Sequence, residues 1–188
     1  YRVLIILIIL FLITFSQSSF SSDRDHTFLE SAKRGDHGTI ALLLKEGVDV
    51  NVTDWAGWTA LNWSSLMLHT KTIQILLESG ANIEHLGKGG KNSGRPLMMA
   101  AKKYGGLNTV KLLISNGAEV DGQDQYGRTP LIMAARYGRL DTVLYLLKNG
   151  ANPNATSILN QWKSALISAK IRGHKNVLDA LIKAGAIQ

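Results

Sequence analysis

Residues 124–150 read DQYGRTPLIMAARYGRLDTVLYLLKNG, and this stretch decides the fold. Its first four residues are typical of a tight turn. Thr129 followed by Pro130 is typical of a helix start, because Thr accepts a hydrogen bond from a free N–H and Pro leaves none unpaired. The small residues at 134–135 allow close contact with a second helix, which is expected to end at Gly150, since glycine readily adopts the left-handed conformation. The stretch therefore predicts a turn and two short packed helices.

The pattern recurs along the chain with a period near 33 residues. A glycine closes a similar apolar run at positions 47, 80, 117, 150 and 185, with spacings of 33, 37, 33 and 35. The residues seven, four and three positions before each glycine are all apolar, which places them on one face of a helix. Such a face can be buried only against neighbouring units, so a repeat architecture is predicted. These positions are Ile40, Leu43, Leu44, Ile73, Leu76, Leu77, Val110, Leu113, Ile114, Val143, Leu146, Leu147, Leu178, Leu181 and Ile182.

The unit closely resembles the ankyrin repeat, whose pattern is D-x-x-G-x-T-P-L-H-x-A-A, a loop Gly, then V-x-x-L-L-x-x-G-A-x-x-N. The likeness runs from about residue 27 to the end, and Asp54, Gly57 and Thr59 restate the motif in the second unit. The resemblance implies an all-α solenoid of about five helix-turn-helix units joined by β-hairpin-like loops. The expected units are a capping repeat at 27–53, internal repeats at 54–86, 87–123 and 124–156, and a second cap at 157–188.

Two departures from the pattern change what we expect locally. The histidine of the motif is replaced by Asn62, Met98, Ile132 and Ile167. Its usual hydrogen bonds to neighbouring hairpins are therefore expected to be absent, which would soften the stack. Leu68 stands where the glycine between the two helices belongs.

The N-terminal residues 3–15 read VLIILIILFLITF, an apolar run preceded by Arg2. Because a membrane span needs about 20 apolar residues, this run is short for a transmembrane helix and typical of a secretory signal. We predict a signal peptide at 1–18 and a linker at 19–26, with an uncleaved membrane anchor as the alternative. The protein is thus expected to be exported, either periplasmic or secreted. A bacterial source is mildly favoured, because a glycan on the sequon at Asn62 would prevent folding.

The composition excludes several kinds of functional site. Cysteine is absent, which excludes disulfides and thiolate sites, and the formal charge of +7 favours acidic partners. There is no Lys/Arg run, so nucleic-acid binding is not expected. The five histidines show no metal-site spacing, and His37, His69 and His174 are expected to be solvated near the turns between helices. The insertion at 87–94 lacks the G-K-[ST] ending of a phosphate loop and is interpreted as a lengthened hairpin tip. A non-catalytic protein without cofactor or metal is expected.

The family resemblance implies that the hairpin tips and the exposed side of the first helices form a concave binding surface. Aromatic and basic residues project there, and Trp, Tyr and Arg are enriched at interface centres. For Trp58 and Trp162 the alternative is simple packing against the neighbouring hairpin, and for the basic residues it is a solvated face. The predicted concave set comprises Trp55, Trp58, Trp63, Arg95, Tyr104, Tyr126, Arg128, Arg136, Tyr137, Trp162 and Lys163.

These observations predict an exported, monomeric protein–protein interaction module whose partner carries an acidic surface. An inhibitor or an immunity-type protein is the leading hypothesis. The alternative is a secreted effector that mimics host ankyrin adaptors. A membrane is expected to matter only if the N-terminal segment stays uncleaved.

Overall fold

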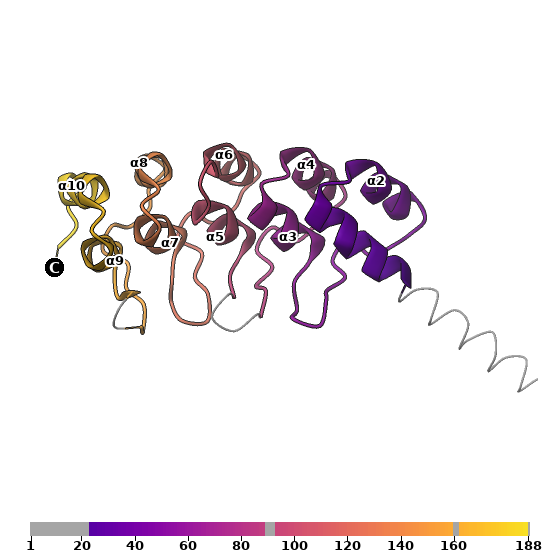
Figure 1. Cartoon of the computed structure of the whole chain (residues 1–188), viewed down its shortest axis with the longest axis horizontal. Helices are drawn as coiled ribbons and strands as arrows, with labels where there is room; N and C mark the ends of the chain where they lie inside the picture. The colour runs from indigo at the N-terminus through magenta and orange to yellow at the C-terminus, as the bar shows by residue number, and fades with distance from the viewer. Residues whose placement is uncertain (1–22, 89–92, 160–161, 188) are drawn as a thin grey trace, which may run out of the picture.

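The computed structural model describes residues 23–88, 93–159 and 162–187, and their architecture is a row of helix pairs (Figure 1). The predicted signal segment at 1–18 lies outside these residues. Isolated bridges join Thr53 to Thr59 and Gly87 to Gly94, and no strand occurs in the described part. The helices are residues 23–34, α2 His37–Lys45, α3 Ala60–Met67, α4 Thr70–Glu78, α5 Pro96–Ala101, α6 Leu107–Ser115, α7 Pro130–Arg136, α8 Leu140–Lys148, α9 Ala165–Arg172 and α10 Lys175–Lys183.

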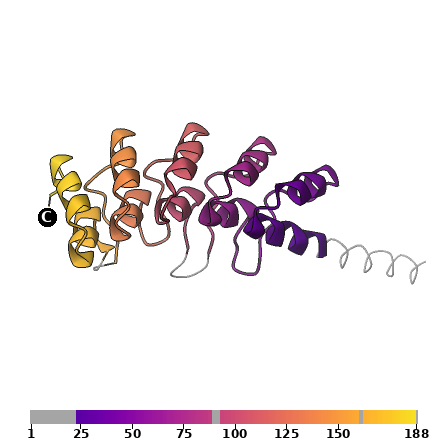
Figure 2. The same cartoon turned by 45° about the horizontal axis from the view of Figure 1, so that its top comes forward.

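The helices form two layers. The first helices of the units, α3, α5, α7 and α9, pack side by side in one layer, while α2, α4, α6, α8 and α10 form the other (Figure 1). The connecting loops project from the layer of first helices, and the pairs spread like a fan (Figure 2). The predicted all-α solenoid is confirmed. Among the described residues, no helix is long and apolar enough to span a bilayer.

Three of the first helices, α3, α7 and α9, begin at a capping side chain, whereas α5 begins at Arg95 without one. The hydroxyls of Thr59, Thr129 and Ser164 accept hydrogen bonds from backbone N–H groups three residues later. Pro130 occupies the first turn of α7, as predicted. These caps satisfy N–H groups that have no partner inside the helix. The starts of α3, α7 and α9 are therefore encoded locally.

The core is the predicted apolar stripe of the second helices packed against the alanines of the first. Ile40, Ile73, Val110 and Val143 are fully buried, one in each of the first four units. In the last unit Ile182 is 55% exposed, because no described helix covers that side. The stack thus buries each stripe between neighbours, as the sequence requires.

The first unit differs from the predicted boundaries. Residues 23–26, expected in a linker, are helical. The first helix of this unit extends over residues 23–34 and buries Phe28 against the core. Arg24 then reaches the end of α2, where it donates to the carbonyl of Glu46 at 2.7 Å and pairs with the carboxylate at 3.2 Å. This ion pair ties the extra turn to the second helix.

Neighbouring units are locked where their two helices meet. His69, Arg139 and His174 each reach back to a backbone carbonyl of the preceding unit, at Lys33, Lys102 and Arg136 respectively, over 3.0 to 3.1 Å. The prediction that His69 and His174 are solvated is therefore wrong. Their imidazoles are half-buried and form hydrogen bonds with carbonyl groups at the ends of first helices in the preceding units.

The imidazoles also explain the glycine between the two helices. A Cβ on Gly138 would lie 2.7 Å from Nδ1 of His174, and Gly138 has φ +68°. In the unit after Leu68, the residue at the start of the second helix is Gly106 rather than a histidine. No imidazole therefore lies against Leu68, and a side chain is tolerated there. Leu68, with φ 65°, is the one non-glycine residue of the described chain in the left-handed region.

Gly138→Ala is expected to destabilise the protein by about 2–3 kcal/mol, because the methyl group adds a clash with His174 to left-handed strain. Gly150→Ala is the matched control: its φ is +88°, but a Cβ there meets nothing within 4 Å. That variant should be destabilised by the left-handed strain alone, at a cost of about 1 kcal/mol. Urea unfolding followed by circular dichroism measures both, and equal losses would contradict the role of His174.

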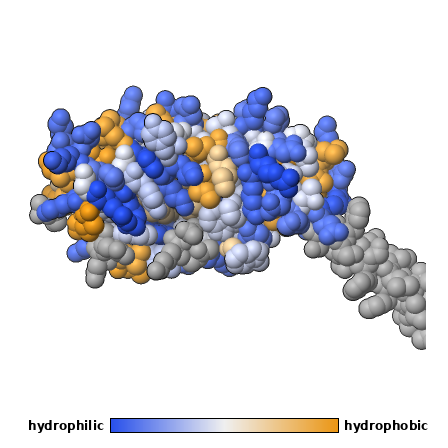
Figure 3. Space-filling model, viewed as in Figure 1, coloured by the Kyte–Doolittle hydropathy of each residue, from blue (hydrophilic) through white to orange (hydrophobic). Residues whose placement is uncertain are grey.

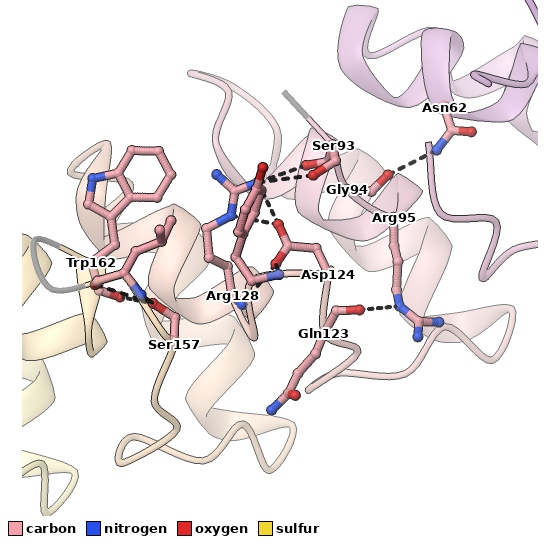
Figure 4. Close-up of polar contacts among 11 residues, drawn as sticks. Asn62, Ser93, Gly94, Arg95, Gln123, Asp124, Arg128, Ser157 and Trp162 are labelled. Carbon is pink, nitrogen blue, oxygen red and sulfur yellow. Dashed lines mark hydrogen bonds and ion pairs between the residues drawn. The ribbon is translucent and has the colours of Figure 1, made fainter. Parts of the chain in front are cut away.

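The expectation of missing inter-hairpin hydrogen bonds is wrong at Asn62. Its amide nitrogen donates to the carbonyl of His85 at 3.1 Å. It also donates to the carbonyl of Gly94 at 3.2 Å (Figure 4). Its side-chain oxygen accepts from Thr59, which completes a capping box. Asn62 is fully buried, as the sequon argument assumed. An amide of this length replaces the missing histidine because it offers both donor and acceptor.

Candidate protein-binding surface

The hairpin tips are tied into one rim by hydrogen bonds between units. Nε of Arg95 donates to the carbonyl of Gln123 at 2.9 Å, and a guanidinium nitrogen of Arg128 donates to the carbonyl of Ser93 at 3.0 Å (Figure 4). Ile158 N–H donates to the carbonyl of Tyr126 at 3.0 Å. The surface is therefore a connected structure rather than a set of independent loops.

Arg128 is not part of the exposed surface, in contrast to the prediction. Its side chain is buried, and its guanidinium pairs with the carboxylate of Asp124 at 2.5 Å (Figure 4). The same carboxylate accepts from the backbone N–H groups of Tyr126 and Arg128, which forms the turn. Arg128 lies inside because the turn places it four positions after its acceptor, Asp124. The sequence alone does not show whether the guanidinium points into the hairpin or toward solvent.

Trp58 is likewise interior, at 4% exposure, as the packing alternative anticipated. Its ring lies 4.6 Å from that of Trp63, centroid to centroid, tilted by 40°. Nε1 of Trp63 donates to the carboxylate of Asp54 at 2.9 Å, and Nζ of Lys33 lies 4.5 Å above the ring. Trp63 is half-buried, and its ring contacts Trp58, Asp54 and Lys33.

Trp162 and Arg136 form a second aromatic–cation pair. The guanidinium carbon of Arg136 lies 3.8 Å from the ring centroid of Trp162, within the range of cation–π attraction. Burial lowers the pKa of Arg136, and Arg172 and Arg128 add to this through repulsion, although a hydrogen bond to Tyr137 opposes it. Trp162 is half-buried, as the packing alternative for this residue anticipated.

The remaining residues of the predicted concave set divide by exposure. Trp55 is 99% exposed and Tyr104 85%, so these two rings are free for a partner. Tyr137 and Lys163 are also exposed, whereas Arg95 and Tyr126 are half-buried. On the face viewed in Figure 3, hydrophobic residues stand in separate groups among hydrophilic ones. The accessible part of the set is thus smaller than predicted.

Two adjoining hollows lie on this surface. The first, which we call the tryptophan cavity, has a volume of about 490 Å³ and is lined by Trp55, Trp58 and Trp63 together with Lys33, Asp54 and Lys102. The second, the tyrosine cavity, has about 470 Å³ and is lined by Tyr104, Tyr137, Lys103 and Arg139. Leu66 and Lys102 line both. The two hollows therefore form one groove across the middle of the stack.

Lys102 is the site residue that sequence reasoning missed. Burial, together with smaller contributions from repulsion by Arg128 and Lys103, lowers its pKa from 10.5 to about 8. A signal for it existed. Lys102 stands five residues after Leu97, as Lys33 follows Phe28 and Arg136 follows Leu131, so the three repeat positions form one row. We call Lys33, Lys102 and Arg136 the basic row.

The insertion at 87–94 does form a hairpin at its base, as interpreted. Gly87 and Gly94 exchange backbone hydrogen bonds of 3.1 and 3.2 Å. A Cβ on Gly87 would lie 2.9 Å from the ring of Trp58, so glycine lets the hairpin close over that ring. The insertion therefore buries one wall of the tryptophan cavity. Among the described residues, no cluster of His, Asp or Glu is suited to a metal.

Comparison with known proteins agrees with this geometry. The family model described as "Ankyrin repeats (3 copies)" matches residues 7–87 and 84–157, well over half of the chain. The chain belongs to the ankyrin-repeat family. Ankyrin repeats are protein–protein interaction modules and are generally non-catalytic, so the groove of this ankyrin-repeat chain is read as a protein-binding surface.

Curated relatives match this chain over a small part of their own length. The human mitochondrial disaggregase is 34% identical over 71 residues, 38% of this chain and 10% of that protein. Inversin from Danio rerio is 36% identical over 61 residues, 31% of this chain and 6% of its own length. A Notamacropus eugenii protein with ankyrin repeat, SAM and basic leucine zipper domains is 31% identical over 102 residues, 52% and 21% respectively. The chain thus spans about a fifth or less of these relatives.

Proposed function

We propose that this ankyrin-repeat protein is an exported, monomeric and non-catalytic binding protein that holds a partner with an acidic surface in its concave groove. The observation that carries the proposal is the charge of the groove. The residues lining the two cavities include four basic side chains, Lys33, Lys102, Lys103 and Arg139, and one acidic side chain, Asp54. Such an imbalance attracts acidic partners and repels basic ones.

The aromatic residues supply the apolar contact area that charged residues alone do not provide. Trp55 and Tyr104 are almost fully exposed and belong to the two different cavities. Exposed rings beside a partly apolar hollow bury large areas on binding, which is why Trp and Tyr dominate interface energetics. An inhibitor or an immunity-type role needs only such affinity, since blocking a partner requires no chemistry. Export is supported by the apolar run at 3–15.

Trp55→Ala combined with Tyr104→Ala is expected to weaken partner binding by at least tenfold, because truncated central aromatics cost about 2 kcal/mol or more. The assay is chemical cross-linking of the full chain in the exported fraction of its source, followed by mass spectrometry. Helical content and melting should stay unchanged, since both side chains are exposed.

The matched control for this experiment is Leu144→Ala, an exposed apolar residue of α8 that lines neither cavity. It should leave capture intact. Capture that survives the double variant but fails with Leu144→Ala would show that the binding surface lies on the layer of second helices. Recovery of the chain from host cytosol instead of the periplasm or medium would favour the effector role.

A further inference from the structure

The ammonium group of Lys102 has no partner in the part of the chain that the structure describes. Its Nζ makes no hydrogen bond or ion pair there, although the residue is half-buried where the two cavities meet. The charges that act on its pKa, those of Arg128 and Lys103, are also positive. A partly desolvated cation without a counter-charge is unfavourable unless an anion binds it. The position therefore calls for an anionic group from outside.

The carboxylates beside the groove are already engaged. Both oxygens of Asp54 accept hydrogen bonds, one from backbone N–H groups and the other from Nε1 of Trp63. Glu30 pairs with Lys33 at 2.6 Å, and Asp124 is held by Arg128. None of these carboxylates is left over for Lys102, so the missing anion is not supplied by these walls.

The tryptophan cavity is suited to an apolar side chain. Leu66 and the edges of the three indoles line it, and its volume of about 490 Å³ exceeds the needs of one large residue. Trp55 lines this cavity and is 99% exposed, so its ring is available to an occupant. Desolvating such an occupant against the apolar lining provides affinity, while Lys102, which also lines this cavity, provides direction.

The two features lie close enough to be met by one short segment. Because Lys102 and Leu66 line both cavities, an occupant of the tryptophan cavity has Lys102 as its immediate neighbour. In an extended peptide, residues two apart point to the same side and are separated by roughly 7 Å. Resting on the function proposed above, we infer that the groove binds an extended acidic peptide segment of the partner, with a bulky apolar side chain in the tryptophan cavity and an Asp or Glu carboxylate on Nζ of Lys102.

A peptide fits these walls better than single-stranded nucleic acid. Base stacking requires rings with open faces. Trp58 is 4% exposed, and the half-buried ring of Trp63 contacts both Trp58 and the ammonium of Lys33, so Trp55 is the one indole of the three that is fully open to a base. Asp54 at the same cavity would also repel a phosphate chain. The carboxylate of a peptide side chain needs one cation, which Lys102 supplies.

The test begins with a random dodecapeptide phage library selected on the full chain, with Lys102→Met as the counter-selection. We expect enriched peptides to carry a large apolar residue two to four positions from an acid. Fluorescence polarisation with the most enriched peptide should give a Kd raised at least tenfold by Lys102→Met and by Trp55→Ala. Lys148→Met, an exposed lysine of α8 outside both cavities, should change the Kd less than twofold.

A second readout reports Lys102 directly. In the chain carrying ¹³C-methylated lysines, the NMR signal of Lys102, assigned by its absence in Lys102→Met, should titrate near pH 8 when free. It should shift to a higher pH once the enriched peptide is bound, since a carboxylate favours the charged amine. Adding the peptide should leave the Lys148 signal unchanged. A Lys102 titration that the peptide leaves unchanged would overturn the proposed contact.

The remaining outcomes separate this inference from the broader function. Peptides that lack acids, or that bind Lys102→Met equally well while still losing affinity with Tyr104→Ala, would overturn the Lys102 site and leave the concave surface standing. A twelve-nucleotide oligothymidylate that binds through Lys102 more tightly than any peptide would assign the site to nucleic acid instead. A selection with no enrichment over the counter-selection would also overturn the inference. The cross-linking experiment decides the broader function by itself.

Discussion

Asp124→Ala is expected to lower the free energy of unfolding by about 3–5 kcal/mol, among the largest effects of any single substitution in this protein. The reason is the burial of its partner. The Arg128 side chain is 1% exposed and that of Asp124 0%, so removing the carboxylate leaves a guanidinium charge inside the hairpin rim. The turn also loses the acceptor of two backbone N–H groups. Urea unfolding followed by far-UV circular dichroism measures the loss.

Asp54 provides the matched control, because it occupies the same turn position two repeats earlier. Its carboxylate accepts equivalent backbone hydrogen bonds, but its other oxygen meets the neutral Nε1 of Trp63 rather than a buried cation. Asp54→Ala should therefore cost only about 1–3 kcal/mol. Adding Arg128→Met to Asp124→Ala should restore part of the loss. If both aspartate variants lose the same amount, the buried charge is not the cause.

Lys102→Met is expected to stabilise the protein by about 2 kcal/mol at pH 7, with the opposite sign to most core-lining substitutions. Burial depresses the pKa of Lys102 to about 8 in the folded state, against 10.5 when exposed. Below pH 8 the amine is charged in both states and the full desolvation penalty opposes folding. Between about 8 and 10.5 the unfolded chain holds a proton that the folded chain has released, so the stability of the wild type rises with pH.

The stabilisation by Lys102→Met should consequently shrink as pH rises through this window and disappear above it. Paired urea melts of wild type and variant at several pH values from 7 to about 10.5 test the sign. Lys148→Met, at an exposed position, should leave stability unchanged at every pH. A wild type already as stable as Lys102→Met at pH 7 would mean that the amine is not desolvated. Because the variant is expected to fold at least as well as wild type, any loss of peptide binding reports the site.

The repeat pattern was sufficient to predict the solenoid because each unit repeats the same local signals. Thr129 caps a helix and Gly150 ends one through contacts within a few residues, and the stripe of Val143 and Leu146 leaves one face to bury. The predicted extent of the first unit was too short by one turn. The ion pair of Arg24 with Glu46, which holds that turn, joins residues 22 positions apart and has no local signature.

By itself the sequence determined the fold, the period and the side of the stack on which aromatic and basic residues gather. The tertiary structure decided which of these side chains are available. Arg128 and Trp58 turned inward because the neighbouring hairpin offers Ser93 O and Gly87 to pack against. Lys102 became a candidate site because it lines both cavities together with Leu66 from the preceding unit. Periodicity places residues on faces, whereas burial and charge pairing depend on contacts between units that no single repeat contains.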